Sequence, residues 1–475
     1  MDIAKLFHFC KTGDLQNLIY LVEEKEVDVN VRDKWDSTPL YYACLCGHKK
    51  MVKYLLYNGA KCEASTFDGE RCLYGALTDE IRSELKKHNM ISSRLIRRDM
   101  YDEFLRRIQE GNCYEDVIFD VHGVQFPAHK CILSARSEYF AIQFKTRWKD
   151  RRVISLRNEM IQSNAFGKIL RYLYLGCLET QFDNLDDCLN IAKQCQLMGL
   201  MEKIEDVCRR KFSLESMKVG VQVNMMIIEP QDKSQELKMD LGQLVNEAVP
   251  TALKKWVPGE LPFEPETSLL YHDVCFQVED HIFNCHKVFF CGRSDYFKAL
   301  VEDHFGECCH NGDVPVIKIK DISVQVFLLV LQYIYQDNCE LSEGIVFEVL
   351  CAADLYLLPG LKRLCAKNMV QYLDVQNTLP ILQSARLFNL PRLESQCAEF
   401  IANNLSWFLS DIGFVEFVKE DAQSIKEREE TDSIDIIDEI RYYISNFVQN
   451  YSDMEEAQER LRKIDDFLFE LELDG

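Results

Sequence analysis

Apolar residues recur at every second position in a short stretch that begins at residue 117. Val117, Phe119 and Val121 follow this spacing, which predicts a half-buried strand. The spacing changes to three and four over residues 132–144, which predicts helix. The residues around this point predict a turn at 122–123, a second short strand at 125–126, a third at 153–156 and a further helix at 166–173. A small sheet capped by helices is an α+β domain.

This pattern occurs twice. Residues 116–140 and 273–297 align without a gap, and 11 of the 25 positions are identical. Further matches occur beyond them, including Tyr172 and Tyr174 with Tyr333 and Tyr335, and the third strand of the second copy is expected at 316–319. Identity at so many positions is far above chance and indicates an internal duplication.

A different unit repeats with a period of about 33 residues near the N-terminus. Its clearest occurrence starts with Thr38, which can cap a helix that Pro39 opens. Gly47 and Gly59 can adopt the left-handed conformation that ends a helix. A degenerate copy precedes this unit and a truncated copy comes after it at 68–76, so we expect two repeats and a partial third. Such helix pairs bury their apolar faces only by stacking.

Composition narrows the class of protein. The 475 residues are 47% hydrophobic, which is ample for several domains. The net charge of −22 disfavours binding to nucleic acid or anionic membranes. The longest apolar stretch, 324–335, is too short to span a bilayer, which takes about 20 residues. No signal peptide is evident, and the 20 unevenly spaced cysteines indicate reduced, buried thiols in the cytoplasm, with the nucleus as the alternative.

The two repeated patterns resemble known families. The unit that contains Thr38-Pro39-Leu40-Tyr41 resembles the ankyrin repeat, although the family's usual histidine is replaced by Tyr41. The duplicated segments resemble the BTB/POZ domain, through Asp-Val-x-Phe, Phe-x-x-His-Lys and Ser-x-Tyr-Phe in both copies. The resulting expectation is ankyrin repeats (1–95), a linker helix (96–114), a first BTB/POZ domain (115–215), a spacer (216–270), a second BTB/POZ domain (271–372), and a helical extension similar to the BACK domain with acidic C-terminal helices (373–475).

The resemblance implies a docking surface for other proteins. A subset of BTB/POZ proteins binds the scaffold cullin-3 through a hydrophobic-x-Glu motif before the third main strand. Phe305 and Glu307 match this motif in the second copy, with Tyr335 expected nearby. Trp148 and Asp150 are the weaker counterparts in the first copy, where the acid is shortened. We therefore expect cullin-3 docking mainly by the second copy, with an ordinary surface loop as the alternative.

Both copies retain an acidic and a basic residue that, in the family, line a charged pocket at the dimer-forming face. These pairs are Asp116 with Lys130 and Asp273 with Lys287. We expect them to maintain the fold rather than to bind a ligand. The two copies can pair within one chain as a pseudo-dimer, or chains can pair as homodimers, and the sequence leaves both open.

The predicted function is that of a non-catalytic adaptor. No nucleotide-binding, metalloprotease or hydrolase motif is present, and the cysteine and histidine spacing does not suit a structural metal site. We expect no cofactor. In the leading hypothesis the chain recruits an unknown protein client to a cullin-3 ubiquitin ligase, through the ankyrin repeats or the C-terminal helices. The alternative is an oligomeric scaffold or signalling mediator without a ligase role.

Overall fold

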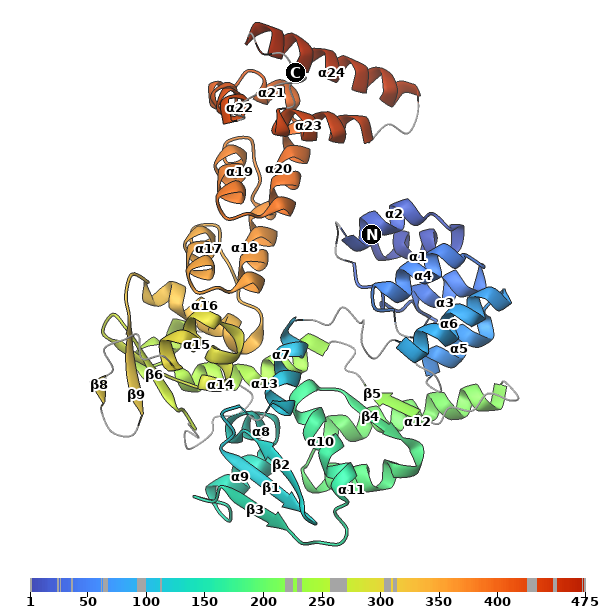
Figure 1. The fold of residues 1–475 in the computed structure, drawn as a ribbon, viewed down its shortest axis with the longest axis vertical. Helices are drawn as coiled ribbons and strands as arrows, with labels where there is room; N and C mark the ends of the chain where they lie inside the picture. Colours follow the sequence, from blue (N-terminus) through green and yellow to red (C-terminus); the bar gives the residue numbers. More distant parts are fainter. Residues whose placement is uncertain are drawn as a thin grey trace. The chain divides into compact units, whose positions relative to one another are not determined.

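The computed structural model describes residues 2–473 with gaps. The gaps are residues 24, 26, 36, 61, 63–66, 92–99, 112, 218–224, 229–232, 257–270, 303–308, 311–313, 425–433, 447–450 and 472. The chain divides into two compact units: residues 1–321 with 334–337, and residues 322–333 with 338–475. Figure 1 labels the elements of both units.

The N-terminal part of the first unit consists of helix pairs. They are α1 (Asp2–Thr12), α2 (Leu15–Glu23), α3 (Pro39–Leu45), α4 (Lys49–Tyr57), α5 (Phe67–Gly75) and α6 (Asp79–Ile91). Thr38 accepts a hydrogen bond from the backbone N–H of Tyr41, and Pro39 opens α3, as the sequence predicts. Gly47 and Gly59 have φ values of +82° and +88°. The third unit, expected to be truncated, has both of its helices.

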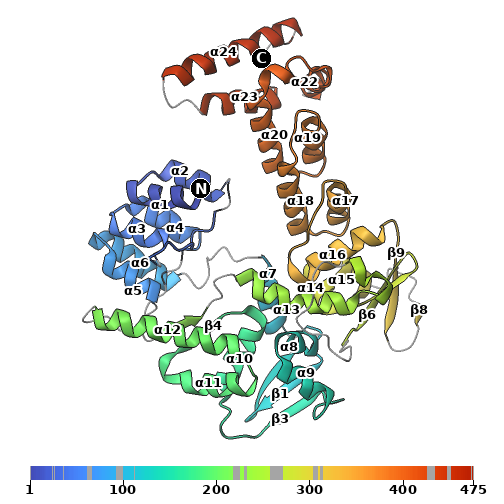
Figure 2. The ribbon, with the colours of Figure 1, turned by 180° about the vertical axis from the view of Figure 1, so that it is seen from behind.

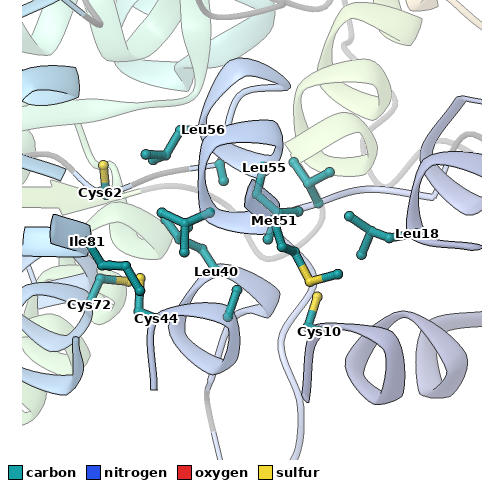
Figure 3. Packing of buried hydrophobic residues seen from close by; sticks show 14 of the residues in the cluster. Cys10, Leu18, Leu40, Cys44, Met51, Leu55, Leu56, Cys62, Cys72 and Ile81 are labelled. Atoms are coloured by element: carbon teal, nitrogen blue, oxygen red, sulfur yellow. The ribbon is translucent and has the colours of Figure 1, made fainter. Parts of the chain in front are cut away.

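One apolar cluster joins these helices. Leu40, Met51 and Leu55 are almost fully buried at its centre, and Figure 3 shows them packed with side chains from neighbouring helices. Buried Cys10, Cys44 and Cys72 belong to the same cluster and act as small apolar groups. Each helix pair thus buries its face only against the next pair, which is why the repeat must stack.

The first duplicated copy contains a three-stranded sheet of order β2-β1-β3. Its elements, with the helix before it, are α7 (Met100–Glu110), β1 (Val117–Val121), β2 (Val124–Ala128), α8 (Lys130–Arg136), α9 (Glu138–Lys145), β3 (Val153–Leu156), α10 (Ser163–Leu175), β4 (Leu178–Gln181), η1 (Phe182–Asn184), α11 (Leu185–Gln194) and α12 (Met198–Met217). Phe119 on β1 lies opposite Phe126 on antiparallel β2 and Ile154 on parallel β3. The alternating residues Val117, Phe119 and Val121 are fully buried, as their spacing predicts.

The segment between the copies, expected to be a spacer, holds regular structure. Its described elements are β5 (Met225–Ile228), α13 (Lys233–Ala248) and the short helix η2 (Thr251–Trp256). Strand β5 pairs antiparallel with β4 of the first copy.

The second copy repeats the core of the first. Its elements are β6 (Val274–Val278), β7 (His281–Cys285), α14 (Lys287–Arg293), α15 (Asp295–Glu302), β8 (Cys309–His310), β9 (Pro315–Ile319), α16 (Val324–Gln336), α17 (Val346–Leu355) and α18 (Pro359–Gln371). Phe276 on β6 lies opposite Phe283 on antiparallel β7 and Ile317 on parallel β9. This register matches that of Phe119, so the duplication seen in the sequence is also a duplication of topology.

Helices make up the described remainder of the second unit. They are α19 (Thr378–Leu387), α20 (Pro391–Asn403), α21 (Leu405–Phe408), α22 (Ile412–Ser424), α23 (Asp435–Asn446) and α24 (Tyr451–Glu470). Arg386 on α19 bonds to Glu394 on α20 at 2.7 Å and to the buried Asp421 on α22 at 2.5 Å. Asp421 also accepts the backbone N–H of Ile436 on α23, so one ionic cluster ties four helices together. The α+β class, with N-terminal helical repeats, is confirmed.

Candidate protein-interaction site

The two copies pack on each other within one chain through the helices that precede them. Helix α7, which precedes the first copy, contacts α10 of that copy and α14 of the second copy. Helix α13, which precedes the second copy, contacts β7 of that copy and α8 of the first. Each copy therefore lends its leading helix to the other. This reciprocal arrangement is the intramolecular pseudo-dimer that the sequence left open.

The α7 contact is aromatic. Phe104 is 2% exposed, and its ring centroid lies 5.9 Å from that of Phe289 on α14. The hydroxyl of buried Tyr101 donates to the backbone carbonyl of Tyr335 in the second copy. The guanidinium of Arg293 lies 4.7 Å from the centroid of the Tyr101 ring, a cation–π geometry. Apolar burial, a buried hydrogen bond and a cation–π contact thus hold α7 to the second copy.

The α13 contact is ionic. The guanidinium of Arg136 on α8, with only 3% of its side chain exposed, pairs with Asp240 on α13 and also donates to the carbonyl of Leu173 at 3.1 Å. Burial raises the pKa of Asp240, and the adjacent Arg136 opposes that shift. On the second copy, Gln336 donates to the carbonyl of Lys238 on α13 at 3.0 Å.

The two predicted charged pockets lie where helices α8 and α14 begin, at the boundary between the copies. A carboxylate oxygen of Asp116 accepts the backbone N–H of Lys130 at 2.7 Å, and Asp273 accepts that of Lys287 at 2.7 Å. Each aspartate therefore serves the N-terminus of α8 or α14, where negative charge is favoured. The ammonium group of Lys130 lies 5.6 Å from the ring centroid of Tyr271, which belongs to the second copy.

The electrostatics of these aspartates couple the two copies. Burial raises the pKa of Asp116 to about 6, and the negative charge of Asp273 contributes to the rise. Burial likewise raises the pKa of Asp273, while the bond from Lys287 opposes it. The pairs serve the fold and the contact between copies in this geometry, since each carboxylate is already engaged by its own helix.

The repeated histidines are structural. The Nδ1 atom of His129 lies 2.7 Å from the hydroxyl of Tyr174, and Nδ1 of His286 lies 2.8 Å from that of Tyr335. Burial lowers the pKa of His286 to about 3, so its imidazole is neutral at pH 7. The hydroxyl of each tyrosine also accepts the backbone N–H of its histidine. The shared His and Tyr residues of the family motif are thus a hydrogen-bonded core pair.

Two of the residues named for the expected cullin-3 contact are buried. Tyr335 is fully buried in its pair with His286, and Trp148 is 4% exposed among the rings of Phe119, Phe140 and Phe144. Neither side chain presents a surface to a partner, because both fill the core. Asp150 is exposed and has a φ of +60°. Phe305 and Glu307 lie outside the described residues, so their role stays a prediction.

The ankyrin stack presents an exposed aromatic residue beside a hydrogen-bonded turn. Trp35 is 61% exposed, next to a turn in which one carboxylate oxygen of Asp33 accepts the backbone N–H groups of Trp35 and Ser37. The other oxygen accepts the hydroxyl of Tyr42 at 2.6 Å. Burial opposes ionisation of Asp33, but these bonds outweigh it and lower its pKa. An exposed tryptophan on an ordered loop is the kind of residue that dominates protein interfaces.

Other site classes find no support among the described residues. They contain no group of three or more His, Cys, Asp and Glu that could hold a metal ion. Most of the described cysteines are buried. No described helix is long and apolar enough to cross a bilayer.

The residues that form the contact between the copies were not identified from the sequence. Tyr101 and Phe104 lay in an expected linker helix, and Asp240 lay in an expected spacer. The available signal was the strong amphipathic pattern of residues 100–110, with Tyr101, Phe104, Leu105 and Ile108 on one face. That pattern shows a buried face but not the surface that buries it.

Comparison with known proteins agrees with this architecture. The family model for the BTB/POZ domain matches residues 105–211 and 264–373, and the model for ankyrin repeats, in three copies, matches residues 4–66. The chain is 30% identical to BTB/POZ domain-containing protein 3 of Schizosaccharomyces pombe, over 99% of this chain and 90% of that protein. It is 28% identical to the ankyrin repeat-containing protein YIL001W of Saccharomyces cerevisiae, over 93% and 89%.

A more distant relative covers the chain in part. The inhibitor of Bruton tyrosine kinase of Xenopus laevis is 23% identical over 72% of this chain, but over only 29% of its own length. The fission yeast protein is similar to nearly the whole chain, including both duplicated copies. The chain therefore belongs to the family of BTB/POZ domain-containing proteins that carry N-terminal ankyrin repeats.

Proposed function

We propose that this chain is a substrate-recruiting subunit of a cullin-3 ubiquitin ligase. Ankyrin repeats and BTB/POZ domains are interaction modules, and the chain combines both, which supports an adaptor role. The second copy docks on cullin-3 and the ankyrin stack holds a client protein. Catalysis belongs to the ligase, and the chain acts in the cytoplasm or nucleus, which imaging of a fluorescent fusion can check.

The continuation of the second copy into a helical extension carries the proposal. Helices α19 and α20 come directly after that copy, and its helix α18 packs against α20. Such an extension widens the cullin contact in the family that the sequence resembles. The second copy also has Phe305 and Glu307 in the family's motif, whereas the corresponding acid of the first copy is the shorter Asp150.

The client side of the proposal is supported by the ankyrin stack. Trp35 is held at the surface by the Asp33 turn, and Tyr57 is 73% exposed. Both side chains are large and rigid, so they lose little conformational entropy when they bind. A Trp35→Ala variant is expected to lose client capture while it retains cullin-3 binding.

The test uses the full chain and the N-terminal region of cullin-3. We expect binding by isothermal titration, and a loss of at least tenfold in affinity for the Phe305→Ala/Glu307→Ala variant. Asp150→Ala, at the equivalent place in the first copy, is the matched control and is expected to bind as the wild type does. Circular dichroism checks that each variant is folded. No binding by the wild type would contradict the ligase role and favour the scaffold alternative.

A further inference from the structure

Helices α11 and α12 of the first copy pack against each other (Figure 2). An apolar groove is lined by side chains of these two helices. Its volume is about 500 Å³. Its apolar lining comes from Leu185, Leu189, Met201 and Ile204. Its polar lining comes from Asn190, Lys193, Glu205 and Arg209, all of which are exposed. A groove with an apolar floor and a charged rim is the kind of surface in which amphipathic helices dock.

The second copy shows how the equivalent surface is covered. Helices α17 and α18 correspond to α11 and α12 at the offset of 161 residues. Val346 and Leu350 take the places of Leu185 and Leu189, and they are 4% and 0% exposed, whereas Leu185 and Leu189 are partly exposed. Helix α18 packs against α20 of the same unit. In the second copy, a helical hairpin from the same chain thus covers the surface that is equivalent to that of α11 and α12.

The hairpin also covers the neighbouring helix. The ring of Phe388, which comes directly after α19, lies 6.2 Å from the ring of Phe347 on α17. The ammonium group of Lys362 on α18 lies 6.0 Å from the centroid of the same ring. The hairpin thus places one aromatic side chain against both α17 and α18.

Among the residues that the structure describes, the first copy does not continue into such a hairpin. Beyond α12, its next described element is β5, which pairs with β4. The lining of the groove comes from α11 and α12 themselves, and Leu185, Leu189 and Met201 remain partly exposed. Both copies thus have this pair of helices, and in the described part of the chain the covering hairpin follows the second copy.

The charged side chains at the rim of the groove indicate the charge of its partner. Lys193 and Arg209 outnumber Glu205, although the whole chain has a net charge of −22. In the second copy the position of Lys193 is taken by Asp354, which pairs with Lys362 at 2.6 Å. We propose that the groove between α11 and α12 docks an amphipathic helix with acidic flanks from another protein. This site shares no residue with the cullin-3 motif or with the ankyrin loop.

A synthetic helix tests the proposal. The probe is a fluorescein-labelled, side-chain-stapled peptide of 18 residues, with Leu along one face and Glu on its flanks. The full chain is expected to bind it, as measured by fluorescence polarisation. A peptide with Lys in place of Glu is expected to bind at least tenfold more weakly. Hydrogen exchange is expected to slow in α11 and α12 when the acidic probe is added.

Two variants locate the site. Lys193→Glu/Arg209→Glu is expected to weaken the acidic probe at least tenfold and to strengthen the Lys peptide. The matched control, Lys149→Glu/Arg151→Glu, reverses two exposed charges elsewhere on the same copy and is expected to change neither affinity. Equal binding of both peptides, or protection outside α11 and α12, would overturn the proposal. Because cullin-3 binding is measured on the same variants, a failure here is distinguishable from a failure of the ligase role.

Discussion

The two BTB/POZ copies of this chain share a core and differ in the contacts that surround it. In each copy an arginine on the helix after the hairpin donates to an equivalent carbonyl: Arg136 to Leu173 and Arg293 to Ile334, both at 3.1 Å. The acids that pair with these arginines differ, since Asp240 belongs to α13 and Asp337 comes directly after α16. Residues that maintain the shared fold have been kept, whereas residues that contact the surroundings have diverged.

The divergence is largest at the last two helices. In the second copy these helices are covered by α20 of the same chain, and in the first copy they line an open groove. The same fold therefore has one helical surface that its own chain covers and one that is left open as a groove. Duplication allows this division because each copy can lose a function that the other retains.

The largest effect is expected where the leading helix of the first copy meets the second. Phe104→Ala removes a buried ring from the contact with Phe289 and is expected to lower the free energy of unfolding by about 3–5 kcal/mol. Urea denaturation measures the change. Met100→Ala, on the same helix but 60% exposed, is the control and should change stability by less than about 0.5 kcal/mol. Similar effects of both variants would argue against close packing of α7.

The histidine pair gives a pH-dependent comparison. The pKa of His286 is about 3 in the folded state, below its unfolded value, so its contribution to stability is complete above about pH 6.5 and is lost as the pH falls. The folded pKa of Asp116, about 6, is raised above its unfolded value. Its contribution to stability is therefore complete below about pH 4 and is lost as the pH rises to about 6.

The comparison therefore uses a variant against the wild type. From pH 7 to 5, His286→Gln is expected to lose roughly 2 kcal/mol less stability than the wild type, at about 1.4 kcal/mol per pH unit. Chemical denaturation at both pH values measures the difference, and the contribution of Asp116 is common to both proteins. An unchanged pH dependence would show that His286 is not buried in its neutral form.

Gly292 on α14 can be used to test how closely that helix approaches α7. A Cβ atom at Gly292 would lie 2.5 Å from a ring carbon of Phe104, so Gly292→Ala is expected to destabilise the protein by about 1–3 kcal/mol. The first copy has Ala135 at the equivalent position. Ala135→Gly is the reciprocal variant, and its expected cost of about 1 kcal/mol reflects helix propensity alone. A stabilising Gly292→Ala substitution would contradict the packing at this contact.

The smallest effect is electrostatic. The charge of Asp273 contributes to the raised pKa of Asp116, so Asp273→Asn is expected to lower the pKa of Asp116 by a fraction of a pH unit. Carboxyl chemical shifts in a ¹³C-aspartate-labelled sample, followed during a pH titration, measure the shift. Asp150→Asn, at an exposed site of the first copy, is the control. If the pKa of Asp116 does not shift in the Asp273→Asn variant, the charge of Asp273 does not influence Asp116.

Local patterns gave the elements of both copies. The period-two spacing of Val117, Phe119 and Val121 predicted β1, and the recurrence at 274–278 predicted β6 with the same register. The helical stretch 132–144 is two helices, α8 and α9, because Ser137 adopts an extended conformation between them. The motif residues Trp148 and Tyr335 were assigned to a surface because the sequence shows which residues recur but not how deeply each is buried.

The sequence alone determined the repeats, the α+β class and the family, because each depends on the order of neighbouring residues or on an offset along the chain. Only the tertiary structure decided that α7 and α13 each contact both copies and that a groove is left between α11 and α12. An amphipathic helix records that one of its faces is buried, but many surfaces satisfy the same pattern. The surface that covers this face is chosen by complementary packing between residues far apart in the chain, such as Tyr101 and Tyr335.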